Sequence, residues 1–258
     1  MEYVKISKEN GQVVPCVAEF PEKPEGVVVA VHGFSSNKEC MTYQLLLRRL
    51  PAAGFGVVGI DLPGHGKDEA AGEELRIAAC LDSIAAAERY AAERFPGLPI
   101  GYFASSFGAY LTGLYISTRP HRGRRAFFRS AAVNMPTLLV KEPTTDAERQ
   151  MLADLNGKGY FDANLGTGRP IRISRGMYHD LETTDLFALF DLNRYGENRV
   201  AMAHGTEDRV IDPAAARRFA EQFDVPLTMF HGEGHSLSDA PDTPDRVADL
   251  AIALYKEA

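Results

Sequence analysis

Residues 100–109 read Ile-Gly-Tyr-Phe-Ala-Ser-Ser-Phe-Gly-Ala, and this stretch decides the fold that we expect for the whole chain. The apolar run that ends at Ala104 predicts a buried strand over residues 99–104, and residues 107–117 predict a helix. Ser105 and Ser106 therefore lie at a sharp turn between a strand and a helix.

Ser106 is the candidate nucleophile of this turn. A serine held on such a turn needs small residues two positions before and two positions after it, because the backbone bends tightly there. Ser106 has Ala104 and Gly108 at these positions, whereas both corresponding neighbours of Ser105 are phenylalanines. The alternative role for Ser106 is that of a helix N-cap, which is common for serine.

A serine hydroxyl becomes a good nucleophile only when a base removes its proton, and the base needs an acid to orient it. His235 is the candidate base, in the run His-Gly-Glu-Gly-His-Ser over residues 231–236. Asp208 is the candidate acid, in the run His-Gly-Thr-Glu-Asp-Arg-Val-Ile over residues 204–211. Each of the three residues follows a predicted strand, at the edge where parallel sheets form their active sites.

Other residues near these positions have simpler interpretations. His231 closely follows a predicted strand, and we assign it to the turn. Asp212 precedes Pro213, a pair that is typical of a helix N-cap followed by proline at the first helical position. His65 lies in the loop Asp-Leu-Pro-Gly-His-Gly over residues 61–66, where it is expected to stabilise a tight turn.

Acyl transfer at a serine also needs N–H donors for the oxyanion that develops on the substrate. One candidate is the backbone N–H of Phe107, directly after the proposed nucleophile. The other is the N–H of Phe34, in the loop His-Gly-Phe-Ser-Ser-Asn-Lys-Glu over residues 32–39, which follows a predicted strand at residues 26–31.

Strands and helices alternate along most of the chain, which predicts a mostly parallel sheet with helices on both faces. The other predicted strands are residues 4–6, 13–20, 55–60, 126–133, 200–203 and 227–230. The other predicted helices are residues 43–50, 74–94, 213–223 and 244–255.

The segment 137–194 breaks this alternation, since it is much longer than a usual connection between two strands. We expect residues 1–136 and 195–258 to form the core, and residues 137–194 to form an inserted cap. Within the cap we predict helices at 145–155 and near 181–192, with extended pieces between 157 and 173. Its apolar side chains are expected to line a substrate pocket, or alternatively to form the cap's own core: Tyr160, Phe161, Met177, Tyr178, Leu186, Phe187 and Phe190.

These motifs, in this order, resemble those of the α/β-hydrolase superfamily over residues 26–255. Within the superfamily the chain looks most like bacterial cinnamoyl (feruloyl) esterases, because of the loop that begins at Phe34 and the long insertion before Asp208. It departs from that group's pattern beside the nucleophile, at Ala104, Phe107 and Ala109.

The resemblance implies an α/β-hydrolase fold and a carboxylesterase-like serine hydrolase that uses Ser106, Asp208 and His235. Its expected substrates are small-molecule esters of small apolar or aromatic acids, cleaved through an acyl-enzyme without a metal or a cofactor. A serine peptidase, a thioesterase or an acyltransferase would use the same triad. A noncatalytic binding protein of this fold is the alternative from a different class.

Composition narrows the range of partners. The formal net charge of −7 argues against a general nucleic-acid or anionic-membrane binder. The three cysteines lack metal-ligand spacing and are interpreted as free thiols in a reducing compartment. The first ten residues contain no apolar signal sequence, and no apolar run reaches the about 20 residues that a membrane span needs. We therefore expect a cytoplasmic protein that binds neither nucleic acid nor membrane.

Overall fold

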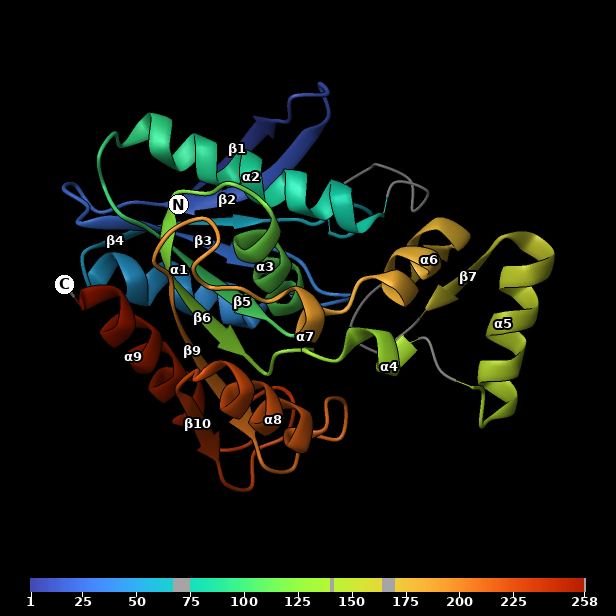
Figure 1. Cartoon of the computed structure of the whole chain (residues 1–258). Helices are drawn as coiled ribbons and strands as arrows, with labels where there is room; N and C mark the ends of the chain where they lie inside the picture. The colour runs from blue at the N-terminus through green and yellow to red at the C-terminus, as the bar shows by residue number, and fades with distance from the viewer. Residues whose placement is uncertain (67–74, 140–141, 164–169, 258) are drawn as a thin grey trace.

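The computed structural model describes residues 1–66, 75–139, 142–163 and 170–257 of the 258-residue chain. At its centre the described residues form a sheet with the strand order β1-β2-β4-β3-β5-β6-β9-β10 (Figure 1). β2 pairs antiparallel with β1 and β4, and the other neighbours in the sheet are parallel. The strands are β1 (Glu2–Ser7), β2 (Val13–Glu19), β3 (Gly26–Val31), β4 (Phe55–Ile60), β5 (Ile100–Ser105), β6 (Gly123–Arg129), β9 (Arg199–Gly205) and β10 (Leu227–Phe230).

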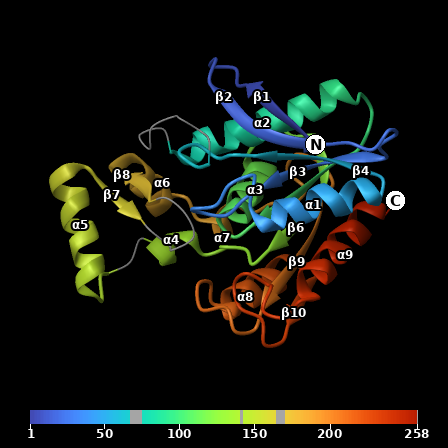
Figure 2. The ribbon, with the colours of Figure 1, turned by 180° about the vertical axis from the view of Figure 1, so that it is seen from behind.

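Helices cover both faces of the sheet, which explains why every residue of β3, β4 and β5 is buried. Side chains alternate between the two faces of a strand. Val27 and Val29 accordingly join the hydrophobic cluster under α2, α3 and α8, whereas Val28 and Ala30 join the cluster under α1 and α9. Figure 2, seen from behind, places α1 and α9 in front of the sheet. These helices are α1 (Met41–Ala52), α2 (Ile77–Arg94), α3 (Phe107–Thr118), α8 (Pro213–Phe223) and α9 (Thr243–Lys256).

α4, α5, β7 and α6 lie to one side of the sheet, with α5 farthest from the centre in both views (Figures 1 and 2). β7 and β8 pair antiparallel as a small separate sheet. Along α5 only Leu155 is buried, so this helix contributes little to the hydrophobic core. The elements are α4 (Met135–Leu139), α5 (Asp146–Lys158), β7 (Tyr160–Ala163), β8 (Ile171–Ser174), α6 (Arg175–Thr183) and α7 (Leu186–Leu189).

Two predicted elements were wrong in their bounds. The strand expected at 126–133 is β6 and ends at Arg129, because Ser130 adopts a positive φ of 47° that extended backbone does not allow. The helix expected near 181–192 is instead α6 and the short α7. Ser174 caps α6 by accepting from the Met177 N–H, and Asp185 caps α7. The predicted start of a helix at residue 74 lies outside the described residues.

Three further observations concern only the part of the chain that the structure describes. No disulfide joins Cys16, Cys40 and Cys80, and Cys16 and Cys80 are buried. No group of three or more histidine, cysteine or acidic side chains there is arranged to hold a metal ion. None of the helices there combines the length and the apolar character that crossing a bilayer requires.

Candidate active site

The turn at Ser106 joins the last residue of β5 to the first residue of α3. Ser106 adopts φ 51° and ψ −117°, a backbone conformation that residues other than glycine rarely occupy. Hydrogen bonds hold the turn on both sides. The Ser106 N–H donates to Arg129 O at 2.9 Å, and Ser106 O accepts from the N–H groups of Ala109 and Ala132. Strain of this kind persists only where the surrounding structure enforces it.

The structure brings Ser106, His235 and Asp208 into a single hydrogen-bonded relay. His235 Nε2 lies 3.0 Å from Ser106 Oγ, and His235 Nδ1 lies 2.8 Å from Asp208 Oδ2. Because Asp208 is an acceptor, it favours the tautomer with the proton on Nδ1, which leaves Nε2 free to accept from the Ser106 hydroxyl. His235 is 24% exposed and Asp208 is buried, so the relay opens to solvent on the serine and histidine side.

Asp208 is surrounded by donors. Its Oδ1 accepts the backbone N–H groups of Val210 at 2.8 Å and Ile211 at 2.9 Å, and its Oδ2 lies 3.1 Å from His204 Nε2 as well as near His235. Burial by itself raises the pKa of Asp208, but the hydrogen bonds from His204 and His235 outweigh it and hold the pKa of this carboxyl well below its usual value. Asp208 is therefore ionised at neutral pH.

The loop after β3 approaches the serine turn very closely. A Cβ atom added to Gly33 would lie 3.2 Å from Ser106 Cβ, and one added to Gly108 would lie 2.4 Å from His32 O. At position 108 the overlap is with backbone atoms, so only glycine permits this approach there. The N–H groups of Phe34 and Phe107 donate to no acceptor among the described residues, and the first N–H groups of a helix have no partner within the helix. Both predicted oxyanion donors thus remain available to a ligand.

The loops after β3 and β4 hold each other through buried polar groups. Lys38 Nζ forms a buried ion pair with Asp61 Oδ2 at 2.6 Å, and Asp61 Oδ1 accepts the Lys38 N–H. Burial lowers the pKa of His32 to about 4, so its ring is neutral at pH 7. Its Nδ1 donates to Gly33 O at 2.7 Å, and its Nε2 accepts the Leu62 N–H. Sequence reasoning assigned no role to Lys38, because a lysine in a polar loop is usually solvated.

Groups at the ends of β6 and β9 hold the loop that carries His235 in place. Ser130 Oγ donates to His235 O at 2.8 Å, and the Arg129 guanidinium donates to Ser236 O. A Cβ atom added to Gly205, at the end of β9, would lie 2.1 Å from Glu233 O. The position of the imidazole therefore depends on β6 and β9 as well as on its own strand.

The competing residues occupy the places that their simpler interpretations predicted. His231 is exposed. Asp212 caps α8 by accepting the Ala214 N–H, with Pro213 in the first turn. His65 is buried, and its Nδ1 contacts Pro63 O at 2.9 Å within its turn.

Most of the side chains that we expected to line a pocket, or alternatively to form the cap's own core, are packed into the interior. Phe161, Met177, Leu186 and Phe190 are buried in the hydrophobic cluster that also contains α2 and α3. The Phe190 ring lies 4.7 Å from that of Phe219 on α8. Of the remaining three, Tyr160 and Phe187 contact arginine guanidinium groups, and Tyr178 is half-buried on α6.

Side-chain contacts attach the segment between β6 and β9 to the sheet and its helices. Asp180 on α6 accepts from Arg76 Nε and Nη2, each at 2.7 Å, and from the Ile77 N–H at 3.1 Å. Asp180 therefore caps the first turn of α2 from outside that helix. Tyr110 on α3 donates its hydroxyl to Thr184 O at 2.7 Å, which ties the segment to the helix that begins at the serine turn.

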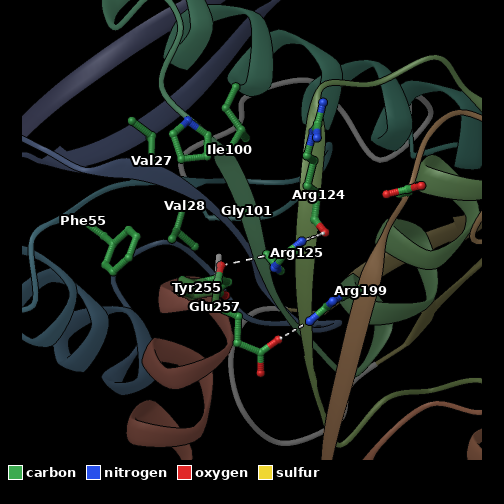
Figure 3. A pocket seen from close by; sticks show the side chains of 12 residues that line it. Val27, Val28, Phe55, Ile100, Gly101, Arg124, Arg125, Arg199, Tyr255 and Glu257 are labelled. Carbon is green, nitrogen blue, oxygen red and sulfur yellow. Dashed lines mark hydrogen bonds and ion pairs between the residues drawn. The ribbon is translucent and has the colours of Figure 1, made fainter.

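A cavity of about 400 Å³ lies at the opposite edge of the sheet (Figure 3). Its lining comes from the starts of the strands, including Val27, Phe55 and Ile100, whereas Ser106 follows the end of β5. Arg199 in its lining pairs with the Glu257 carboxylate at 3.1 Å, and Arg125 donates to Glu257 O at 3.3 Å. We therefore place the candidate active site at the carboxyl edge and not in this cavity.

The parallel sheet and the strained serine at the end of β5 define a protein with the α/β-hydrolase fold. Residues 22–181 match the sequence profile of a hydrolase family described as serine aminopeptidase S33, and the chain belongs to this family. A comparison with curated proteins found no match. The family match confirms the resemblance that the sequence motifs indicated.

Solved structures show the same fold over nearly the whole chain. Est1E from Butyrivibrio proteoclasticus, with ferulic acid bound, is 19% identical, with a TM-score of 0.80 over 98% of this chain and 100% of that one. A highly thermostable carboxyl esterase from Bacillus coagulans is 18% identical, with a TM-score of 0.72 over 98% and 97%. Alpha/beta hydrolase domain-containing protein 10 from mouse is 13% identical, with a TM-score of 0.74 over 99% of both chains. The predicted fold class is confirmed.

Proposed function

We propose that this chain is a serine esterase that cleaves carboxylic esters of small apolar or aromatic acids through an acyl-enzyme. The observation that carries the proposal is the contact of His235 Nε2 with Ser106 Oγ, at 3.0 Å, together with that of His235 Nδ1 with Asp208 at 2.8 Å. A nucleophile, a base and an acid that orients the base are the groups that acyl transfer at serine requires.

In the first half-reaction Ser106 Oγ attacks the ester carbonyl carbon while His235 Nε2 takes the hydroxyl proton. The negative charge that moves to the carbonyl oxygen is stabilised by the N–H groups of Phe34 and Phe107. The tetrahedral intermediate then collapses. The bond to the alcohol oxygen breaks, His235 gives its proton to that oxygen, and the acyl group stays on Ser106.

In the second half-reaction water attacks the acyl-enzyme and His235 takes a proton from the water. The new intermediate releases the carboxylic acid, and the proton returns from His235 to Ser106 Oγ. Asp208 stays ionised throughout and stabilises the imidazolium. The hydrogen bonds that lower its pKa support this role.

We propose that residues 137–194 form a cap over the carboxyl edge of the sheet and that this cap selects the substrate. The Tyr110–Thr184 hydrogen bond supports this assignment, because it ties the segment to the helix that begins at the nucleophile. The half-buried ring of Phe34, at 5.7 Å from that of Phe107, supports an apolar acyl group beside the oxyanion donors. The bound ferulic acid in Est1E is consistent with the aromatic class.

An aminopeptidase is the second candidate, and the description of the family favours it. The same relay attacks amides, and the difference lies in the leaving group and in recognition of the substrate's α-ammonium. The two activities are separated by measuring turnover rather than by the geometry of the relay.

The test combines a covalent probe with a substrate panel. A fluorophosphonate should label the wild type at Ser106, located by mass spectrometry of the labelled peptide, and should leave Ser106→Ala unlabelled. The panel compares p-nitrophenyl acetate, butyrate and cinnamate with aminoacyl p-nitroanilides and acyl thioesters. We expect the esters to be cleaved fastest. Hydrolysis of the anilides alone would establish the aminopeptidase instead, and absence of both labelling and turnover would refute a serine hydrolase.

A further inference from the structure

His204 lies on β9 and is completely buried. It shares a face of the strand with Val200 and Met202, which belong to the hydrophobic cluster on that side. Its Nε2 lies 3.1 Å from Asp208 Oδ2 and 3.2 Å from Ile211 O. Both of these atoms are acceptors, so Nε2 carries a proton and donates it. Its Nδ1 has no hydrogen-bond partner within the described residues.

We propose that His204 is a positioning residue for the reaction, acting through Asp208 to hold its Oδ2 toward His235. This inference rests on the proposed function. An ionised carboxylate offers about four acceptor sites. At Asp208 two backbone N–H groups bind Oδ1 and two imidazoles face Oδ2. The second imidazole fixes the rotation of the carboxylate about its last bond.

Removing the His204 donor has two consequences for the relay. The carboxylate loses a constraint on the oxygen that orients His235, so the imidazole is held less firmly toward Ser106. Oδ2 is also left with one hydrogen-bond donor fewer, so the imidazole of His235 remains as its facing donor. Arg129 at the end of β6 also interacts with Asp208, and it is unchanged in all the variants below.

A purely structural role is the competing explanation, because His204 also reaches Ile211 O. That role would lower stability without changing the relay. Two substitutions remove the donor to Asp208: His204→Phe keeps an aromatic ring, and His204→Asn is too short to reach the carboxylate. His204→Gln can place an N–H near the original Nε2. His121→Phe is the matched control, since His121 is half-buried and contacts Ile116 O.

The first measurement is steady-state kinetics with the p-nitrophenyl ester that the wild type cleaves fastest. We expect His204→Phe and His204→Asn to lower kcat about ten- to a hundredfold, the effect of losing a hydrogen bond to a charged group, with KM nearly unchanged. His204→Gln should recover most of kcat, and His121→Phe should match the wild type. If the folded donor-removing variants keep the wild-type kcat, the inference is overturned.

A double-mutant cycle with Asp208→Asn tests whether His204 acts through Asp208. We expect His204→Phe to have almost no further effect on kcat in the Asp208→Asn background, whereas fully additive losses would overturn the inference. A readout independent of turnover is the far-downfield proton resonance of the His235 Nδ1–H, which His204→Phe and His204→Asn should shift. An unshifted resonance contradicts the inference even in a protein without esterase activity. If the wild type showed neither ester turnover nor probe labelling, the proposed function would be refuted, whereas the resonance measurement would still test the inference.

Discussion

The loops that carry the relay and the segment between β6 and β9 are built in different ways. The relay loops combine side-chain hydrogen bonds, such as that of Ser130 to His235 O, with very close backbone approach, as at Gly108 and Gly205, where even a methyl group would overlap backbone oxygens. The segment between β6 and β9 is attached by side chains, such as Asp180 to Arg76 and Tyr110 to Thr184. A side-chain substitution in this segment is therefore expected to leave Ser106, His235 and Asp208 in place.

The largest effect should come from Ser106→Ala in the relay loops. We expect kcat for the best ester to fall by about five to six orders of magnitude, since the group that becomes acylated is lost. Ser105→Ala is the matched control, because Ser105 is the last residue of β5 and has no hydrogen bond to His235 among the described residues. It should keep most of the activity. An inactive Ser105→Ala with an active Ser106→Ala would reverse the assignment.

Asp208→Asn should lower kcat by about four orders of magnitude, because the amide favours the wrong tautomer of His235. Asp212→Ala is the control in the same loop. Asp212 caps α8, so its replacement should cost about 1 kcal/mol of unfolding free energy and leave kcat nearly unchanged. Kinetics and urea unfolding of both variants provide the check. A collapse of kcat in Asp212→Ala alone would contradict the assignment of the acid.

Substitutions in the segment between β6 and β9 are expected to have a smaller effect on kcat/KM. Tyr178→Ala on α6 should change the ratio of kcat/KM for cinnamate to that for acetate by about tenfold, the range that a lost apolar contact gives. Tyr160→Ala is the control, because the Tyr160 ring lies under the Arg172 guanidinium on the outer hairpin. It should leave the ratio unchanged. If neither this substitution nor truncation of Phe187 changes the ratio, the segment does not select the acyl group.

The smallest effect on turnover should follow from Asp180→Asn, at the attachment of α6 to α2. Burial raises the pKa of Asp180, but the hydrogen bonds from Arg76 and Ile77 lower it below its usual value. A carboxyl group whose pKa is lower in the folded than in the unfolded protein stabilises the fold at pH values above its unfolded pKa. This stabilisation is lost as the pH falls through the pKa of the folded protein. Asp180→Asn should therefore cost about 1 kcal/mol at pH 7 and less below about pH 4, with kcat nearly unchanged. Unfolding curves at both pH values are the measurement, and a cost that grows at low pH would contradict the sign.

The predicted order of the core elements came directly from local patterns. Continuous apolar runs such as residues 26–31 and 55–60 indicated strands buried on both faces, and the apolar periodicity of residues 43–50 indicated a helix. Each of these elements is present. The bounds of β6 and α6 were wrong because they depend on single backbone conformations and caps, at Ser130 and Ser174, that compete with the hydrophobic pattern.

The sequence by itself determined the fold class and the three strand ends where candidate catalytic residues stand, because periodicity and turn chemistry are local properties. Only the tertiary structure decided which side chains meet. It placed His204 against Asp208, paired Lys38 with Asp61 in the interior, and packed Phe190 onto α8 rather than into a pocket. These contacts depend on how strands and helices pack in three dimensions, and local sequence patterns do not specify that packing.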